Sequence, residues 1–131
     1  MTRERDIPAR YWTYELGEGW CVMAGKSDLD NDLVTFRVAR QTDHWFHLHG
    51  APGSHVILRG PEGAEATREL LEAAAAIAAY HSKARKAGLV PVDCCLAKEV
   101  SKPRHVPAGT VAIARSRTLK VRPALPPGYS A

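Results

Sequence analysis

The first forty residues alternate apolar and polar positions in a way that predicts a hairpin followed by a short helix. Two β-rich runs, RYWTYEL (10–16) and WCVMAG (20–25), flank a Gly-Glu-Gly segment, which is the pattern of two strands joined by a tight turn. Residues 28–39 then carry apolar residues at roughly helical spacing, and Ser27 or Asp28 can cap the helix.

A second pair of strands is predicted by the runs DHWFHLHG (43–50) and SHVILRG (54–60). Both runs alternate with period two, and in a strand this places successive side chains on opposite faces. Trp45 and His47 therefore share one face. The connection contains Pro52-Gly53, which fits a type II turn with Gly53 at positive φ.

One long helix is predicted over residues 67–87. It starts at a threonine suited to N-capping, acidic residues follow in its first turns, and apolar residues recur on one helical face. Lys83, Arg85 and Lys86 then fall in the last turn, and Gly88 ends the helix.

Strand patterns return in the C-terminal third, in PVDCCLAKEV (91–100), TVAIAR (110–115) and TLKVRP (118–123). Strands and helices are mixed without regular strand–helix–strand alternation. The expected fold class is therefore α+β: a compact single domain with a mixed, mostly antiparallel sheet, one long helix and one short helix. The Pro-rich tail that follows is expected to fray.

Composition adds few constraints. A chain of 131 residues can form one self-sufficient core, and 45% hydrophobic with 24% charged residues is ordinary for a soluble globule. No apolar run approaches the roughly 20 residues of a membrane span, and the N-terminus lacks a secretory signal, so we expect a cytoplasmic protein without membrane contact. Cys21, Cys94 and Cys95 are best explained as buried thiols.

The charges are distributed unevenly. Residues 1–93 hold 11 Lys and Arg against 13 Asp and Glu, a net charge of −2, whereas residues 94–131 hold 7 against 1, a net charge of +6. This asymmetry indicates a polyanionic partner for the C-terminal third, although a solvated basic surface would give the same counts.

Four of the six histidines fall between Asp43 and His55, which raises the possibility of an enzyme. A metal-dependent enzyme would use His47, His49 and His55 as ligands, because clustered imidazoles suit zinc or a non-haem metal. A hydrolase would combine Asp43 with His47, or Ser54 with His55, but no Gly-x-Ser-x-Gly motif accompanies them.

Binding of a polyanion accounts for more of the sequence. The APGSH turn offers backbone N–H groups, the Ser54 hydroxyl and the His55 imidazole to a phosphate. Trp45 and His47 could stack on bases or sugars beside it. Cations for further phosphates are spread along the chain: Arg59, Lys83, Arg85, Lys98, Lys102, Arg104, Arg115 and Arg117.

These residues resemble the NFACT-R domain, an RNA-binding family also known as DUF814. Its core signature is similar to DHWFH (43–47), PGSH (52–55) and Arg59. Further segments match at suitable spacing: Gly25 with Asn31 and Asp32, SKAR at 82–85, VPVD at 90–93, Lys98, Val100, Lys102 and Pro103, and Gly109, Val111, Thr118 and Leu119.

The resemblance implies an RNA-binding domain over residues 12–122, after an N-terminal extension (1–11) and before the Pro-rich tail (123–131). In the tailing factors of ribosome-associated quality control this module accompanies helix-hairpin-helix and coiled-coil segments. The chain resembles the small stand-alone bacterial form, so RNA binding is expected of it and tailing activity is not. The expected partner is tRNA or ribosomal RNA, and with it the large ribosomal subunit, without a cofactor or chemistry of its own.

The residues expected to bind RNA form two sets. The more specific patch is Asp43, Trp45, His47, Ser54, His55 and Arg59, and the phosphate contacts are Lys83, Arg85, Lys98, Lys102, Arg104, Arg115 and Arg117. The chain departs from the family at Lys26-Ser27, which stands for Arg-Asn, and at Cys94, which stands for a Tyr. His49 has no family role, which leaves the metal-dependent enzyme as an alternative. An adaptor that docks on a ribosomal protein is another.

Overall fold

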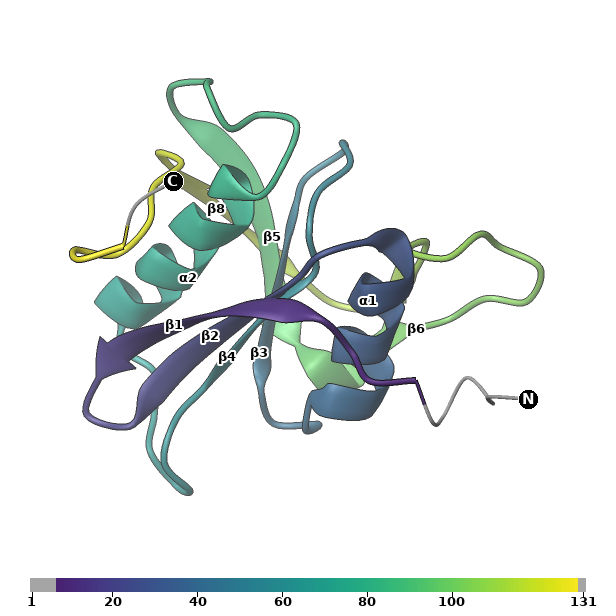
Figure 1. Cartoon of the computed structure of the whole chain (residues 1–131), viewed down its shortest axis with the longest axis horizontal. Coiled ribbons are helices and arrows are strands. Elements are labelled where there is room, and N and C mark those ends of the chain that lie inside the picture. Colours follow the sequence, from purple (N-terminus) through teal and green to yellow (C-terminus); the bar gives the residue numbers. More distant parts are fainter. Residues whose placement is uncertain (1–6, 130–131) are drawn as a thin grey trace.

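The fold is built on a six-stranded sheet with the spatial order β1-β2-β4-β3-β5-β8. It is seen in a computed structural model that describes residues 7–129 (Figure 1). The strands are β1 (Tyr11–Gly17), β2 (Trp20–Gly25), β3 (His44–Leu48), β4 (Val56–Arg59), β5 (Val90–Leu96) and β8 (Arg117–Val121). Every neighbouring pair is antiparallel. Both predicted hairpins and the α+β class are therefore confirmed.

One face of the sheet is covered by α2 (Arg68–Tyr80), which lies on the left in Figure 1. The helix is rich in alanine, so its backbone lies close to the sheet, and Ile77 is fully buried against Phe46 and Leu58 in the core. The predicted start is confirmed, because the Thr67 hydroxyl accepts a hydrogen bond from the N–H of Leu70 at 3.2 Å.

The predicted end of this helix is wrong. α2 ends at Tyr80, so the cations expected in its last turn lie in the connection that follows. There the N–H of Lys83 donates to the Pro52 carbonyl (3.2 Å), and the His81 carbonyl accepts from the N–H of Ser54 (2.9 Å). In a longer helix these two groups would bond residues four positions away. Pairing with the 52–54 turn uses them instead.

The other face carries α1 (Asp28–Leu33), which continues into the π-helix η2 (Val34–Val38). Ser27 caps α1 by accepting from the N–H of Asp30 at 3.1 Å, so the predicted short helix is confirmed. Beside it lie η3 (Ala97–Glu99) and the small hairpin of β6 (Val100–Ser101) and β7 (Ala112–Ile113). η2, β6 and β7 contribute to a second apolar cluster, which includes Met23, Val34, Trp45, Ile57 and Cys95.

Gly53 does not have the conformation that the predicted type II turn requires. It does not adopt positive φ, whereas Gly50 does, at 73°. Gly53 is instead required because a Cβ there would lie 2.8 Å from the Cβ of Ser82, with which it forms an isolated β-bridge. The glycine permits a close approach of two backbones.

The C-terminal tail is ordered rather than frayed up to Tyr129. The N–H of Ala124 donates to the Ala76 carbonyl of α2 at 3.2 Å, and Leu125 packs against the core. The Tyr129 hydroxyl accepts from the N–H of Glu15 in β1 at 2.9 Å. Residues 1–6 of the predicted N-terminal extension lie outside the described residues, as do 130–131.

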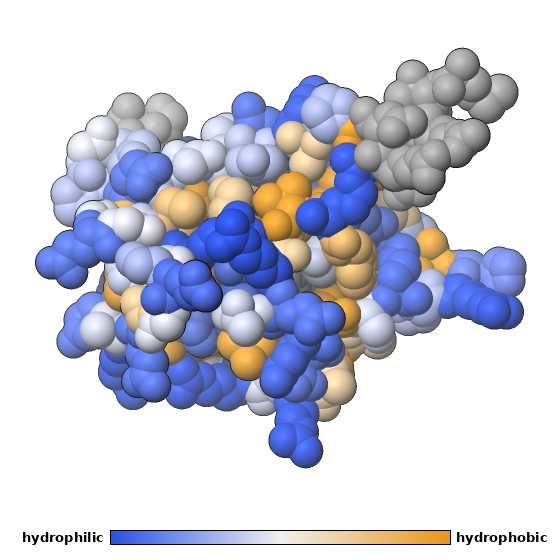
Figure 2. All heavy atoms as spheres, turned by 90° about the horizontal axis from the view of Figure 1, so that it is seen from below, coloured by the Kyte–Doolittle hydropathy of each residue, from blue (hydrophilic) through white to orange (hydrophobic). Residues whose placement is uncertain are grey.

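The surface mixes hydrophilic residues with a few exposed apolar ones. The face in Figure 2 shows a central band of apolar residues between hydrophilic ones. Within residues 7–129, no helix has both the length and the apolar run that crossing a membrane requires. Trp12, at 38% exposure, is one of the largest exposed apolar side chains. It lines a groove beside residues 52–54.

Candidate functional site

Asp43 and Arg59 of the predicted specific patch form an ion pair. Asp43 is 5% exposed, and its Oδ2 lies 2.7 Å from Nη2 of Arg59. The same nitrogen donates to the Val38 carbonyl (2.8 Å), and Asp43 also accepts from the N–H of Arg40 (2.9 Å). Hydrogen bonds to Asp43 raise the pKa of the Arg59 guanidinium. The pair ties the end of η2 to β3 and β4.

His55 lies at the centre of a buried relay. Its Nε2 is 3.1 Å from the Gly109 carbonyl, which only accepts, so Nε2 carries the proton. Its Nδ1 therefore accepts from the hydroxyl of Thr35 (2.8 Å), which in turn accepts from Nε1 of Trp45 (2.9 Å). Burial lowers the pKa of His55 to about 4, with the nearby His47 adding to the effect. His55 is thus a neutral structural group.

Asn31 and Ser54 hold the turn from its inner side. Oδ1 of Asn31 accepts from the N–H of His55 (3.0 Å), and its Nδ2 donates to the Gly53 carbonyl (3.4 Å). The Ser54 hydroxyl donates to the Gly25 carbonyl at 2.6 Å. With its N–H and hydroxyl both donating within the protein, Ser54 does not present them to a phosphate as predicted.

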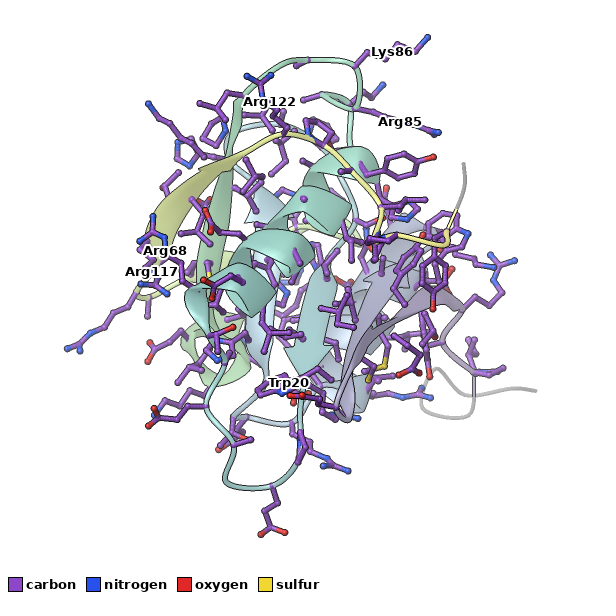
Figure 3. The ribbon with its side chains drawn as sticks, turned by 90° about the vertical axis from the view of Figure 1, so that its left-hand side faces the viewer. Trp20, Arg68, Arg85, Lys86, Arg117 and Arg122 are labelled. Atoms are coloured by element: carbon purple, nitrogen blue, oxygen red, sulfur yellow. The ribbon has the colours of Figure 1, made fainter. Side chains whose placement is uncertain are left out.

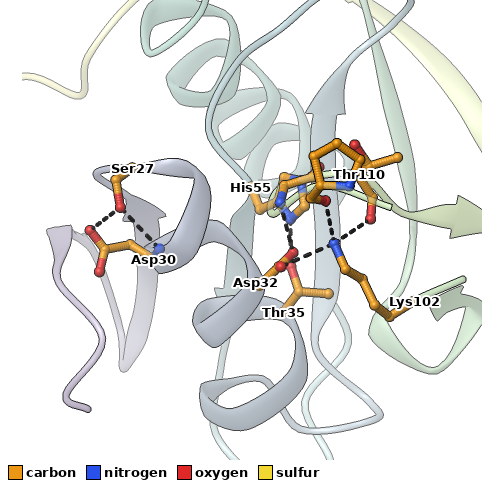
Figure 4. A network of polar contacts seen from close by, with 9 residues as sticks. Ser27, Asp30, Asp32, Thr35, His55, Lys102 and Thr110 are labelled. Atoms are coloured by element: carbon orange, nitrogen blue, oxygen red, sulfur yellow. Dashed lines mark hydrogen bonds and ion pairs between the residues drawn. The ribbon is translucent and has the colours of Figure 1, made fainter. Parts of the chain in front are cut away.

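Lys102, a predicted phosphate contact, is part of the same framework (Figure 4). Its Nζ lies 3.0 Å from the Asp32 carboxylate and donates to the carbonyls of Pro107 (2.7 Å) and Thr110 (2.8 Å). Asp32 also accepts from the N–H of Gly109 at 3.0 Å. These contacts fasten the loop between β6 and β7 to α1.

The stacking role predicted for Trp45 is wrong, because the side chain is fully buried and η2 contributes Val34 and Thr35 to its surroundings. His47 lies half-buried beside it, with ring centroids 5.9 Å apart, and burial lowers the pKa of His47. Strand alternation had correctly placed both residues on one face. It could not show that the face is covered.

The three histidines of the metal alternative are not brought together. His49 is largely exposed, and its Nδ1 lies 2.9 Å from the Asp93 carboxylate. His47 and His55 pack edge to face. Among residues 7–129, no group of three or more His, Cys, Asp or Glu side chains is arranged to hold a metal ion.

The cysteines are not activated nucleophiles. Cys94 and Cys95 are buried on opposite faces of the sheet, in different apolar clusters. Burial raises the pKa of Cys95 to about 12 and that of Cys94 in the same direction. Since the thiolate is the reactive form, neither thiol is a nucleophile near neutral pH.

A groove with a volume of about 400 Å³ opens beside the 52–54 turn. We call it the turn groove. The described residues that line it include three exposed cations and one acid, Asp28, together with three aromatic rings. The cations are Lys26, Lys83 and Arg85, and the rings are Trp12, Tyr80 and His81.

The rings of the turn groove are held in place. The indole of Trp12 stacks on the imidazole of His81, with centroids 4.2 Å apart and planes 11° from parallel. Nε2 of His81 is hydrogen-bonded to the Tyr14 hydroxyl at 2.6 Å. Burial, and then the charge of Arg85, lower the pKa of His81 to about 4. A neutral, fixed imidazole therefore supports the exposed indole.

Two of the cations lie over these rings. Nζ of Lys26 is 5.3 Å from the Trp12 ring centroid, and the guanidinium carbon of Arg85 is 4.0 Å from that of Tyr80. Arg85 also donates to the Tyr80 hydroxyl. Such cation–π contacts position the charges at the mouth of the groove.

The remaining predicted phosphate contacts lie elsewhere. Lys98, Arg104, Arg115 and Arg117 are exposed. The N–H of Ala114 donates to the Glu99 carbonyl, which places Lys98 and Arg115 near one another. Figure 3 shows Arg85, Lys86 and Arg122 at one end of the molecule and Arg117 well apart from them. Arg117 thus lies apart from the cations of the turn groove.

The three rings of the groove and one of its cations were absent from the predicted site: Trp12, Tyr80, His81 and Lys26. The sequence holds a partial signal for Trp12. It lies two residues before the core residue Tyr14, on the same face of β1 and near the start of that strand. The contact with His81 depends on where α2 ends. That end is set by a pairing between distant segments, which periodicity does not contain.

Comparison with known proteins identifies relatives for most of the chain. A family model described as "NFACT protein RNA binding domain" matches residues 10–115. Two proteins named Rqc2 homolog RqcH are similar: that of Bacillus subtilis (strain 168) is 40% identical over 111 residues, and that of Streptococcus suis (strain 05ZYH33) is 39% identical over 102 residues. These matches cover 85% and 78% of this chain but 19% and 18% of the relatives.

A solved structure is similar as well. It is the C-terminal part of the fibronectin/fibrinogen-binding protein from Streptococcus suis, with a TM-score of 0.75 and 38% sequence identity. The match covers 80% of this chain and 42% of that one. The chain thus shares its fold with one part of a larger protein, and it spans about a fifth of the length of the RqcH relatives.

Proposed function

Because the chain belongs to the family of NFACT RNA-binding domains, we propose that it binds RNA, and that the turn groove is the main contact. The observation that carries the proposal is the convergence of Lys26, Lys83 and Arg85 with fixed aromatic rings on one preformed groove. Cations bind the phosphate backbone and rings stack on bases, and sites for single-stranded nucleic acid combine both.

The proposed partner is tRNA or ribosomal RNA. Two relatives carry the name Rqc2 homolog RqcH, and this supports a role in ribosome quality control, at the large ribosomal subunit in the cytoplasm. Lys98, Arg104, Arg115 and Arg117 form a second set of exposed cations, which we assign to flanking phosphates.

The proposed activity is binding without chemistry. Asp43, Trp45, His47, Ser54, His55 and Arg59 act by shaping the turn and its supports rather than by touching RNA. Support comes from the burial of Asp43, Trp45, Ser54 and His55, from the hydrogen bonds of Arg59 to Asp43, and from the packing of half-buried His47 against Trp45. His55 is neutral with both ring nitrogens engaged, and the thiols of Cys94 and Cys95 are protonated, so none of them is poised for catalysis.

Filter retention of labelled total tRNA tests the proposal at about 50 mM and about 200 mM salt. We expect binding that weakens steeply with salt, because each phosphate contact releases counterions and adds a slope of about −0.7 to −0.9. Arg85→Gln should reduce that slope by about one contact. The matched control is Arg68→Gln. Arg68 is the first residue of α2, whereas Arg85 lies beyond the other end of that helix (Figure 3).

The control should leave both affinity and slope unchanged. An absence of binding at the lower salt concentration, or binding that does not respond to salt, contradicts the proposed function. Equal effects of the two substitutions would place the RNA elsewhere on the surface. Loss of affinity in Arg117→Gln, measured in the same way, tests the second set of cations.

A further inference from the structure

We infer that the turn groove receives one unpaired nucleotide, whose base stacks on Trp12 and whose phosphate is bound by Lys83 and Arg85. The inference rests on the RNA-binding function proposed above and makes it specific. It names the structural class of RNA that the groove selects, namely a strand with an accessible base.

Trp12 is suited to stacking because it is both exposed and fixed. It lies on β1, an edge strand, with 38% of its surface exposed. Its ring rests on His81, which Tyr14 holds by a hydrogen bond of 2.6 Å from the core side. A ligand therefore meets a preoriented indole, and little side-chain freedom is lost on binding.

Two cations of the groove lie over aromatic rings, and a base could take the place of the one over Trp12. Lys26 lies over Trp12, and Arg85 lies over Tyr80. At an exposed site a cation–π contact is weaker than the stacking of a base on an aromatic ring. An incoming base therefore displaces the cation. The displaced Lys26 ammonium remains beside the nucleotide and adds its charge to those of Lys83 and Arg85.

Side chains are better placed to bind that phosphate than the N–H groups of Ser54 and Lys83 are. The N–H groups of Ser54 and Lys83 donate to protein carbonyls, at 2.9 Å and 3.2 Å. The turn therefore does not offer these two groups to an anion. The long, exposed side chains of Lys83 and Arg85 at the rim supply the charge instead.

The site selects against a base-paired helix. In an A-form duplex the base faces are covered by their neighbours, so aromatic side chains stack only on bases in single strands, loops or ends. The groove volume of about 400 Å³ is within the range of small-ligand sites. It therefore fits one nucleotide.

Tryptophan fluorescence provides the test, because Trp20 and Trp45 are buried, at 8% and 0% exposure, whereas Trp12 is exposed. The probes are a single-stranded RNA oligonucleotide, a hairpin that pairs the same sequence and is closed by a linker without bases, and adenosine monophosphate. We expect the single strand to quench the fluorescence of the wild-type protein, and the hairpin to bind with little quenching. Adenosine monophosphate tests whether the groove binds a free nucleotide as well as it binds a nucleotide within RNA. We expect it to bind far more weakly than the strand.

Substitution of Trp12 sharpens the test. Trp12→Ala should lose the quenching and weaken single-strand binding about 5- to 150-fold, the effect of removing one base stack, while hairpin binding is unchanged. Trp12→Phe keeps a ring and should fall between. The matched control is Phe36→Ala, which removes an equally exposed ring, 40% against 38%, outside the groove.

Two results would overturn the inference. Equal binding of strand and hairpin, unchanged in Trp12→Ala, would leave RNA binding intact but refute the stacked nucleotide. A mononucleotide that binds as tightly as the strand would make the groove a site for free nucleotides. Failure of every RNA to bind at low salt would instead contradict the proposed function itself.

Discussion

His55→Leu is the substitution that most directly tests the buried relay beneath the turn. Leucine has a similar size but makes no hydrogen bond. The change removes the bonds from His55 to the Thr35 hydroxyl and to the Gly109 carbonyl, at 2.8 Å and 3.1 Å. A buried polar group left without its partner costs about 1–3 kcal/mol. With two such groups, we expect the free energy of unfolding at pH 7 to fall by about 2–5 kcal/mol.

The same residue predicts how stability depends on pH. Burial lowers the pKa of folded His55 to about 4, from 6.5, so below pH 6.5 the unfolded chain binds a proton that the folded protein does not. The contribution of this residue is complete above pH 6.5 and is lost as pH falls toward 4. Between pH 7 and pH 5 the loss is about 2 kcal/mol, since one pKa unit corresponds to about 1.4 kcal/mol. His55→Leu lacks this loss.

Urea denaturation of both proteins at pH 7 and pH 5 measures these quantities. The gap in unfolding free energy should be large at pH 7 and about 2 kcal/mol smaller at pH 5. His49→Leu is the control, because His49 is exposed and its ion pair with Asp93 is worth at most about 1 kcal/mol. A gap that is the same at both pH values would refute the neutral, hydrogen-bonded state assigned to His55.

Three further substitutions probe the supports of the groove. Asp43→Asn should lower the free energy of unfolding by about 2–4 kcal/mol in urea, because it breaks the pair with Arg59; a loss below about 0.5 kcal/mol would contradict the structural role. Gly53→Ala should lower both the melting temperature and tRNA retention, because its Cβ meets Ser82 at 2.8 Å, whereas a Cβ at Gly88 meets only Arg122 Nη1, at an ordinary 3.9 Å, so Gly88→Ala should change neither. Lys102→Met should speed amide exchange in the β6–β7 loop but leave the central strands protected, and unchanged loop exchange would show that Lys102 does not fasten it.

Local patterns predicted the strands and the helix starts because their causes are local. Alternation in residues 43–50 follows from the geometry of a single strand, and Thr67 caps α2 through the N–H of Leu70 three residues away. The end of α2 failed because its cause is distant in sequence. Gly53 and Ser82 meet across the fold, and periodicity carries no information about that contact.

The same distinction applies to the candidate site. Most of the signature residues between Asp43 and Arg59 are buried and hydrogen-bonded. Their position in the sequence does not show that η2 packs against Trp45. The turn groove combines Trp12 with Tyr80 and His81. Residues so far apart become one site only through the sheet order and the early end of α2.

The ordered tail has a consequence for the behaviour of the molecule in concentrated solution. β1 is an edge strand, and unpaired backbone groups along such an edge invite pairing with a strand from another molecule. The Tyr129 hydroxyl occupies one of these groups, the N–H of Glu15, and the ring of Tyr129 lies edge-on against Tyr14, at 5.0 Å. The last turn of the chain thus blunts the exposed margin of the sheet and opposes self-association through β1.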